Sequence, residues 1–338
     1  MRDTYIIAEL GNTHEGSLGL AKQMILAAAD SGANAVKFQT HIFEKESLLQ
    51  APNPTYFTDE SRKEYFERTS FTLTQLQSLK QFSEKQCKVD FLSSPFSVEA
   101  VEFLEKLEIK TYKIPSGEVT NTLLLERVAK SGKKVLLSSG MNTWSELDGA
   151  VNVLRENGCK DLVVLQCTSK YPCPPEDAGL NVLGELRERY NVEVGFSDHT
   201  LGPAIPLAAV ALGAVIIEKH FTLSKLMYGS DAKNSMEPAE FKSMVEYIRE
   251  IDICIKNKVT KKGLSEDLLV MKAVFEKSIV STCEIKKGEI ITKEHISVKK
   301  PGDGIPVKYY QYIIGKTALC RIEKDTKLTP LDIDDFAW

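Results

Sequence analysis

Two histidines follow apolar runs that are predicted to be neighbouring buried strands. His199 comes just after residues 192–196, and His220 comes just after residues 214–217. Residues 201–213 are apolar and long enough for one short helix, so both histidines are expected at the same edge of a parallel sheet. Two neutral imidazoles there can hold a divalent metal and leave positions open for water or substrate. The alternative interpretation is that each histidine forms only local hydrogen bonds.

Two lysines occupy an unusual place, inside or at the end of apolar predicted strands. These are Lys37 and Lys113. An unpaired ammonium is costly to bury, so each lysine should face a partner. Together with Ser116, Ser138 and their backbone N–H groups, the two lysines can hold a phosphate or a carboxylate. The alternative is that each lysine pairs with a nearby carboxylate as a structural ion pair.

Three carboxylates are further candidates for the site. Glu9 and Glu118 end predicted strands, where they can act on protons or hold hydroxyl groups. Asp231 lies on the loop after the last predicted strand and is the least distinctive of the three.

The elements that carry these residues follow a regular rhythm of strand and helix. Each predicted strand is strongly apolar, ends in polar residues and is followed by a helical pattern. Eight such units predict a closed (β/α)8 TIM barrel, an α/β fold in which chemistry takes place at the carboxyl ends of the strands. The predicted strands are residues 5–8, 33–38, 89–92, 109–114, 135–137, 161–166, 192–196 and 214–217.

Two stretches depart from this rhythm. Residues 40–72 are rich in Pro, Tyr, Phe and Glu, and we interpret them as a long loop over the barrel rim, with room for a short helix. From residue 278 onward, short alternating runs separated by turn residues indicate a small β-rich domain. We therefore predict a barrel over residues 1–256, a linker over 257–277 and a β-rich domain over 278–338.

Composition limits the class of protein. The formal net charge of −4 gives no reason to expect a nucleic acid or a membrane surface as partner. No apolar run is long enough to span a bilayer, and the early first strand leads us to expect no signal peptide. The seven cysteines are odd in number, scattered and free of any Cys-x-x-Cys pair, which indicates reduced thiols in a cytoplasmic protein.

The order of these motifs resembles the N-acetylneuraminate (sialic acid) synthase family over nearly the whole chain. One example is Tyr112-Lys-Ile-Pro-Ser-Gly-Glu118. The tail resembles the antifreeze-like, or SAF, domain of these enzymes, in residues 285–289, 298–302 and 315–316. The matching barrel segments are residues 6–11, 14–16, 36–39, 93–97, 112–118, 138–141, 166–169, 171–172, 197–200 and 218–221.

The resemblance implies a reaction and a role for each site residue. Phosphoenolpyruvate would condense with an N-acylated mannose-type sugar to give a nine-carbon 2-keto sugar acid and phosphate, assisted by Mn²⁺ or Mg²⁺. The catalytic residues would be Glu9, Lys113 and Glu118. The remaining roles are metal binding by His199 and His220, phosphoenolpyruvate binding by Lys37, Gln39, Ser94, Lys113, Ser116, Ser138 and Ser169, and sugar binding by Glu118, Tyr171, Asp231 and Lys300 of the partner chain.

The same resemblance implies a domain-swapped homodimer, in which each SAF domain covers the partner's barrel mouth and excludes water. Three positions depart from the common pattern of the family: Thr13 stands where Asn is frequent, Ser169 where many members have Asn, and Lys300 where Arg is usual. Lysine keeps the charge of arginine but loses its bidentate fork. The identity of the sugar is therefore open between N-acetylmannosamine and a 2,4-diacetamido-2,4,6-trideoxyhexose, the precursor of a legionaminate-type acid.

Two other functions compete with this interpretation. A synthase of octulosonate or heptulosonate phosphates would need a second anion site, whereas the sequence offers one basic cluster and an SAF-like tail. A non-catalytic barrel that binds a glycan or a protein would be expected to have lost some of the reactive residues. Glu9, Lys37, Lys113, His199 and His220 are all present.

Overall fold

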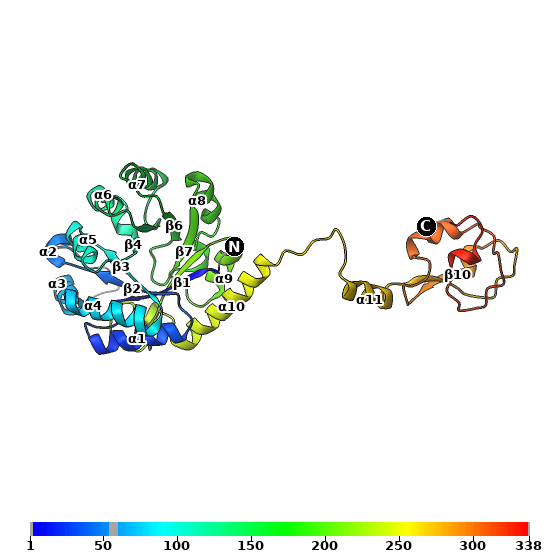
Figure 1. Cartoon of the computed structure of the whole chain (residues 1–338), viewed down its shortest axis with the longest axis horizontal. Helices are drawn as coiled ribbons and strands as arrows, with labels where there is room; N and C mark the ends of the chain where they lie inside the picture. Colours follow the sequence, from blue (N-terminus) through cyan, green and yellow to red (C-terminus); the bar gives the residue numbers. More distant parts are fainter. Residues whose placement is uncertain (1–2, 54–59, 337–338) are drawn as a thin grey trace. The chain divides into compact units, whose positions relative to one another are not determined.

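The computed structural model describes residues 3–53 and 60–336, and the chain divides into two compact units. One unit is Met1–Lys258 and the other is Val259–Trp338. Elements β1 to α10 belong to the first unit, and elements from α11 onward belong to the second (Figure 1).

The first unit contains a closed barrel of eight parallel strands, with β8 paired back to β1. This arrangement confirms the predicted (β/α)8 fold. All the strands except β4 extend further toward their carboxyl ends than predicted; for example, β1 includes Glu9 and β8 includes His220. The strands are β1 (Tyr5–Gly11), β2 (Ala35–Thr40), β3 (Asp90–Pro95), β4 (Thr111–Ile114), β5 (Lys134–Ser138), β6 (Leu162–Cys167), β7 (Glu193–Asp198) and β8 (Ile216–His220).

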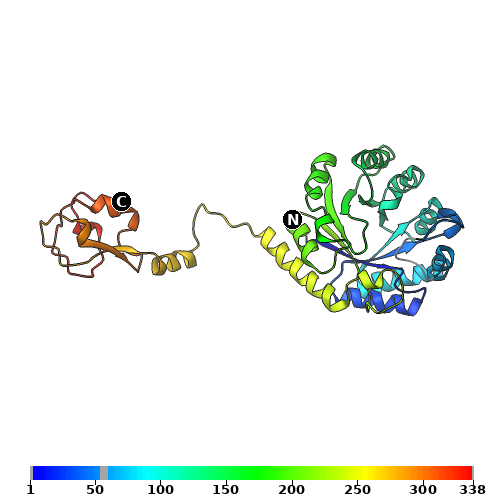
Figure 2. The ribbon, with the colours of Figure 1, turned by 180° about the vertical axis from the view of Figure 1, so that it is seen from behind.

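Helices surround the barrel, one after each strand. Helix α10 packs against both α9 and α1, which closes the ring (Figure 2). Local signals in the sequence explain where helices begin, since the Ser17 hydroxyl accepts a hydrogen bond from the backbone N–H of Leu20 at the start of α1. These helices are α1 (Leu18–Asp30), α4 (Leu73–Gln81), α5 (Val98–Glu105), α6 (Thr122–Lys130), α7 (Trp144–Glu156), α8 (Val182–Tyr190), α9 (Ala204–Ala211) and α10 (Pro238–Lys256). No helix in the described part of the chain is long and apolar enough to cross a membrane.

The barrel has two apolar layers, because successive strand residues face opposite sides of the sheet. Outward-facing residues such as Ile6, Ala8 and Leu10 pack against the helices. Inward-facing residues fill the barrel interior as a separate buried cluster, comprising Ile7, Ala35, Leu92, Leu136, Val163, Leu165 and Ile216. This inner cluster forms an apolar floor, and the next inward positions toward the carboxyl ends of the strands lie above it.

The stretch from residue 40 to residue 72 is more ordered than the predicted loop. It contains two short helices, α2 (Phe43–Glu46) and α3 (Arg62–Thr69), where the sequence led us to expect a loop with room for one. Helix α3 begins at a capping box, in which Ser61 and Glu64 satisfy each other's backbone N–H groups. Residues 54–59 of the predicted loop lie outside the described residues.

The second unit has its own small apolar core. Regular strands are few: β9 (Ser278–Ser281) pairs antiparallel with β10 (Ile296–Lys299), and single bridges such as Ile285 with Ile322 join other predicted runs. Helix α11 (Glu266–Phe275) lies within the predicted linker, and α12 (Tyr310–Ile313) follows β10. The core consists of Ile279, Ile285, Ile291, Ile296, Ile305, Ile313, Ala318, Ile322, Leu328 and Ile333.

Candidate active site

A cavity of about 590 Å³ opens at the carboxyl ends of the barrel strands. Every barrel residue that the sequence predicted for the site lines this one cavity. They are Glu9, Lys37, Gln39, Ser94, Lys113, Ser116, Glu118, Ser138, Ser169, Tyr171, His199, His220 and Asp231. The fold therefore brings together residues that are more than 200 positions apart in the chain.

Strand alternation explains why these side chains converge. Ile7 belongs to the apolar floor, so Glu9, two positions further along β1, faces the same interior at the level of the cavity. The same step of two leads from Leu136 to Ser138 on β5. Strands of a closed parallel barrel all place their carboxyl ends at one rim, where these polar side chains meet.

Two buried lysines at the base of the cavity are paired with two buried carboxylates. The ammonium of Lys37 lies 2.7 Å from Glu9 Oε2 and donates to the Ser94 hydroxyl at 3.1 Å. The ammonium of Lys113 donates to Glu218 Oε1 at 3.0 Å, and Ser197 donates to the same oxygen at 2.9 Å. The structural ion pairs that we considered as the alternative interpretation are therefore present. All four of their residues also line the cavity.

The charges of Lys37 and Glu218 are maintained despite burial. Burial alone would lower the pKa of Lys37, but Glu218 and Glu9 outweigh it and raise that pKa overall. Burial would likewise raise the pKa of Glu218, yet Lys113 and Lys37 hold it at about 2. In the described contacts Lys113 Nζ donates a single hydrogen bond, which leaves two of its three N–H donors for a ligand.

Hydroxyl groups line the same cavity as the two lysines. The Ser138 hydroxyl is buried and has no hydrogen-bond partner among the described residues. Gly140 lies beside it, and a Cβ at that position would come within 2.6 Å of Ser116 Oγ and 2.7 Å of Ser169 Oγ. Only a glycine therefore lets these two serines approach the backbone so closely.

The two histidines lie close together on adjacent strand ends. Their ring centroids are 5.4 Å apart. His199 Nδ1 lies 2.7 Å from the carbonyl oxygen of Thr168, so Nδ1 carries the proton and Nε2 is left as an acceptor. His220 Nδ1 is buried and has no partner within the described ranges, and burial lowers the pKa of His220, which keeps that ring neutral.

This donor set fits a metal that is held by two imidazoles and completes its coordination with water or substrate. The unpartnered, buried Nδ1 of His220 is the observation that supports the fit. A closed structural site is not supported, because residues 3–53 and 60–336 contain no cluster of three or more His, Cys, Asp or Glu side chains in metal-binding arrangement.

The predicted sugar-binding residues lie higher in the cavity. The Tyr171 ring is 4.1 Å from the His199 ring, centroid to centroid. Glu118 Oε2 accepts a hydrogen bond of 2.7 Å from Asn121 Nδ2, while burial raises the pKa of Glu118 overall. Asp231 faces β1, because a Cβ added to Gly11 would lie 2.6 Å from Asp231 Oδ2.

Lys300 belongs to the second unit and is not among the residues that line the cavity. Its ammonium lies 4.9 Å from the centroid of the Phe275 ring at the end of α11. A cation over an aromatic face gains from the ring quadrupole, which keeps this side chain next to α11.

The cavity also contains residues that the sequence did not single out for the site. Glu218 is the counter-ion of Lys113, and its place two residues before His220 on the same strand face was a usable signal. His41, Glu46 and Arg62 come from the stretch after β2, where the sequence carries no periodic pattern. Arg62 forms no ion pair with any described carboxylate, and its buried Nε has no hydrogen-bond partner there.

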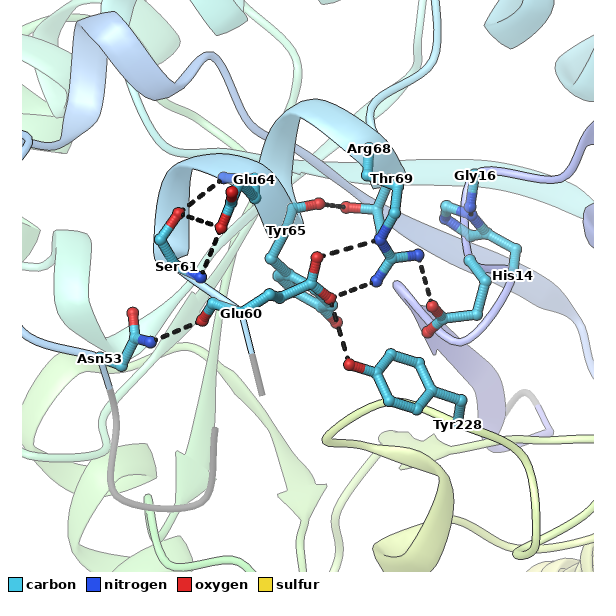
Figure 3. A network of polar contacts seen from close by, with 11 residues as sticks. His14, Gly16, Asn53, Glu60, Ser61, Glu64, Tyr65, Arg68, Thr69 and Tyr228 are labelled. Atoms are coloured by element: carbon cyan, nitrogen blue, oxygen red, sulfur yellow. Dashed lines mark hydrogen bonds and ion pairs between the residues drawn. The ribbon is translucent and has the colours of Figure 1, made fainter. Parts of the chain in front are cut away.

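One exposed network joins three loops at the cavity rim. Figure 3 shows Arg68 of α3 at its centre. The guanidinium donates to both carboxylate oxygens of Glu60, at 3.1 and 2.6 Å, and to Glu15 Oε2 at 2.6 Å. The Tyr228 hydroxyl, on the loop after β8, also donates to Glu60 (Figure 3). Gly16 permits this approach, because a Cβ there would collide with the Arg68 carbonyl oxygen.

Comparison with known proteins identifies the family of this barrel and tail. The model of the NeuB family matches residues 24–260, and the model of the SAF domain matches residues 276–334. The chain belongs to the NeuB family. The resemblance inferred from the sequence motifs is therefore confirmed, together with the presence of an SAF domain.

Named members of the NeuB family align with nearly the whole chain. N,N'-diacetyllegionaminic acid synthase of Campylobacter jejuni is 40% identical and covers 96% of this chain and 98% of its own length. Human N-acetylneuraminate-9-phosphate synthase is 33% identical over 98% of this chain and 93% of its own. The crystal structure of N-acetylneuraminic acid (sialic acid) synthetase from Leptospira borgpetersenii in complex with citrate superimposes with a TM-score of 0.70, 34% identity, and coverage of 80% of this chain and 91% of that one. These similarities indicate an enzyme of the nonulosonate synthase type.

Proposed function

We propose that the protein condenses phosphoenolpyruvate with an N-acylated mannose-type sugar to give a nine-carbon 2-keto sugar acid and inorganic phosphate. The NeuB family membership and the names of its relatives support this proposal. The observation that carries it is the pair of buried ammonium groups, Lys37 and Lys113, which face the cavity beside the unpaired Ser138 hydroxyl. Such preoriented donors suit a phosphate or a carboxylate, and phosphoenolpyruvate carries both.

In this proposal the anion end of the cavity has a defined composition. Phosphoenolpyruvate would be bound by Lys37, Gln39, Ser94, Lys113, Ser116, Ser138 and Ser169. Lys113 offers its two remaining N–H groups to the phosphate, and Glu218 is the counter-ion of that buried ammonium. Preoriented donors of this kind stabilise the charge on the phosphate as it leaves.

His199 and His220 would hold the metal, which we propose to be Mn²⁺ or Mg²⁺. When bound, the ion supplies a Lewis acid that polarises the aldehyde of the open-chain sugar. The Thr168 carbonyl fixes the ring orientation of His199, and strand β8 carries His220.

Glu9 is the residue that we propose to move a proton. Its carboxylate is held between the Lys37 ammonium and the side-chain amide of Gln39, which donates to Glu9 Oε1 at 2.8 Å. After C3 of the enol has attacked the sugar aldehyde, water adds at C2 and Glu9 takes the proton that this water releases. Burial of the site protects the reactive carbon from other nucleophiles.

The sugar would lie between the metal-binding histidines and the upper wall, in contact with Glu118, Tyr171 and Asp231. We further propose that the protein is a cytoplasmic homodimer and that Lys300 of the partner subunit reaches the N-acyl group of the sugar. The seven cysteines, all free in the described structure, support a reducing compartment.

The heptulosonate-type alternative is less well supported, because the described residues of the cavity lining include one lysine pair and a single arginine, Arg62, rather than two basic clusters. Two carboxylates, Glu46 and Glu118, line the cavity together with Arg62, which disfavours a phosphorylated acceptor. A neutral acceptor sugar is therefore expected.

The experiment that tests this function is phosphate release from phosphoenolpyruvate in the presence of N-acetylmannosamine or 2,4-diacetamido-2,4,6-trideoxymannose. Each assay is run with Mn²⁺ and again with EDTA. Release with one sugar that requires the metal supports the proposal and identifies the acceptor. Release that survives EDTA contradicts the proposed roles of His199 and His220, and no release with any N-acyl sugar, N-acetylmannosamine 6-phosphate included, contradicts the condensation itself.

A further inference from the structure

A chain of hydrogen bonds runs from the wall of the cavity to Glu9. Glu46 Oε1 lies 2.7 Å from His41 Nδ1, and His41 Nε2 lies 3.0 Å from Gln39 Oε1. The chain ends where Gln39 Nε2 donates to Glu9 Oε1 at 2.8 Å. The side chains of His41 and Glu46 are only 6% and 7% exposed, so most of their surface is covered by protein.

The direction of every bond in this chain is fixed by its Glu9 end. Glu9 Oε2 lies 2.7 Å from the Lys37 ammonium, so Glu9 is an ionised carboxylate and can only accept. Gln39 must therefore turn its NH₂ group toward Glu9 and its oxygen toward His41. Because an amide oxygen can only accept, His41 Nε2 must carry a hydrogen.

At the Glu46 end of this hydrogen-bond chain, the other ring nitrogen of His41 must also carry a hydrogen. Glu46 Oε2 already accepts from the backbone N–H of Ile42, and Glu46 Oε1 faces His41 Nδ1. A carboxyl group gives up its proton more readily than an imidazolium, so the shared proton belongs on His41. Both ring nitrogens then donate, and His41 is a cation with Glu46 as its counter-ion.

The surroundings of the ring suit a cation. His41 is stacked between Phe66, at 3.8 Å between centroids, and Phe96, at 4.0 Å. The faces of two aromatic rings present negative charge to an imidazolium. In the described part of the chain the ring contacts come from Gln39 of β2, Glu46 of α2, Phe66 of α3 and Phe96 after β3, so Glu46 is the only charged group in contact with it.

We propose that His41, protonated and paired with Glu46, is a positioning residue that holds the Gln39 amide and, through it, the Glu9 carboxylate. The inference rests on the proposed function for the role of Glu9. A neutral His41 would lose one ring N–H, and Gln39 could then turn its oxygen toward Glu9 and place two acceptors against each other. Loss of a His41 ring hydrogen therefore disorders the proton-accepting group of the proposed reaction.

The first test measures the charge of His41 directly and does not depend on activity. The full chain is labelled with ¹⁵N-histidine, and the ring signals are recorded at pH 7 in the wild type and in His41→Phe, which identifies the His41 signals among the five histidines. Two protonated nitrogens in the His41 ring support the proposal. One protonated and one bare nitrogen would overturn it, whether or not the protein proves to be a synthase.

The second test uses kinetics, once phosphate release has been established for the wild type. His41→Phe keeps the aromatic stack and removes both N–H donors, so kcat should fall about tenfold or more, and KM for phosphoenolpyruvate, for which Gln39 is one of seven proposed ligands, should rise by a smaller factor. Glu46→Gln keeps the shape but removes the negative charge that faces His41, so kcat and its pH profile should both change. Unchanged kcat and an unchanged pH profile in both variants would overturn the proposal.

A matched control distinguishes positioning from a general loss of structure. The Ser70 hydroxyl donates to the backbone carbonyl of His41 at 3.2 Å and takes no part in the hydrogen-bond chain from Glu46 to Glu9. Ser70→Ala should therefore leave kcat and the pH profile unchanged. A fall in kcat for Ser70→Ala as large as that for His41→Phe would show that the local fold, not the hydrogen-bond chain, limits activity.

Discussion

Asp198 and Lys219 form a buried ion pair between the ends of β7 and β8, and the next residue along the chain is a histidine in each case. Their side chains are 0% and 1% exposed, and Lys219 also donates to the carbonyl oxygen of Thr200. His199 and His220 line the cavity, whereas their neighbours Asp198 and Lys219 do not. The ion pair therefore fixes the spacing of the two strand ends that present the imidazoles.

Removal of one charge from this pair should be costly. Asp198→Asn leaves Lys219 buried without a counter-ion, and we expect the free energy of unfolding to fall by about 3–5 kcal/mol. Urea denaturation monitored by circular dichroism measures this change. Glu67→Gln breaks an exposed pair with Lys63 on α3 and should change stability by less than ~0.5 kcal/mol. Equal effects of the two variants would contradict the structural role of Asp198.

Gly140 is predicted to control the approach of phosphoenolpyruvate. Gly140→Ala places a methyl group against Ser116 Oγ and Ser169 Oγ, so the two hydroxyls must move and KM for phosphoenolpyruvate should rise about tenfold or more. Gly149 is exposed on α7, and a Cβ added there would meet no atom within 4 Å. Gly149→Ala should therefore leave KM unchanged and stabilise the helix by ~0.5–1 kcal/mol. Steady-state kinetics of both variants provide the comparison, and an unchanged KM in Gly140→Ala would count against a ligand at this position.

The barrel and most of the cavity were predictable from the sequence, because the apolar strands and the polar residues at their ends indicate the same fold and the same rim. In an apolar strand that is buried on both faces, a lysine or glutamate near the carboxyl end can reach polar surroundings only at the barrel rim. Lys37, Lys113 and Glu9 were identified by this reasoning, and all three line the cavity.

The partners of these residues were not predictable from the local sequence. Lys113 pairs with Glu218 across the barrel, a contact between residues 105 positions apart that depends on closure and register. The sequence did not identify His41 and Glu46, because residues 40–72 show no periodic pattern that indicates which side chains face the cavity. The placement of these side chains is set by packing of α2 and α3 on the rim, which only tertiary structure specifies.

His14 should make the fold sensitive to mild acid. It is 1% exposed, and its Nδ1 accepts from the backbone N–H of Gly16, so burial lowers its pKa from 6.5 to about 4. As pH falls below 6.5 the unfolded chain binds a proton that the native state cannot bind until about pH 4. Stability should therefore fall across this window by up to ~3 kcal/mol from this group.

His14→Asn removes this titration. The variant should be less stable than the wild type at pH 8, because it loses the ring contacts with Phe38 and Phe71. Its loss of stability between pH 8 and pH 5, measured by urea denaturation, should nevertheless be smaller than that of the wild type. An equal loss in both proteins would assign the acid sensitivity to other groups.

Arg68 should affect the acceptor sugar rather than phosphoenolpyruvate. Its guanidinium joins Glu15 and Glu60, and Tyr228 of the same network lies three residues before Asp231. Arg68→Lys keeps the charge but cannot bridge both carboxylates, so we expect KM for the sugar to rise several-fold with little change in KM for phosphoenolpyruvate. Arg189→Lys, in an exposed pair with Asp148 on the outer helices, is the matched control. If Arg68→Lys changed KM for the sugar and KM for phosphoenolpyruvate by similar factors, the proposal that the two substrates occupy separate parts of the cavity would be contradicted.

Metal binding should depend on both imidazoles, because the described cavity offers no third side chain in metal-binding arrangement. Loss of either histidine leaves a single protein ligand, so His199→Gln or His220→Gln should weaken Mn²⁺ binding by about tenfold or more. Electron paramagnetic resonance of free Mn²⁺ during titration measures this affinity without any assay of activity, and EDTA should reverse the binding. His295→Gln, in the second unit, serves as control. Wild-type affinity in the His199→Gln/His220→Gln double variant would place the ion elsewhere, and the two rings would then serve only to shape the wall beside Tyr171.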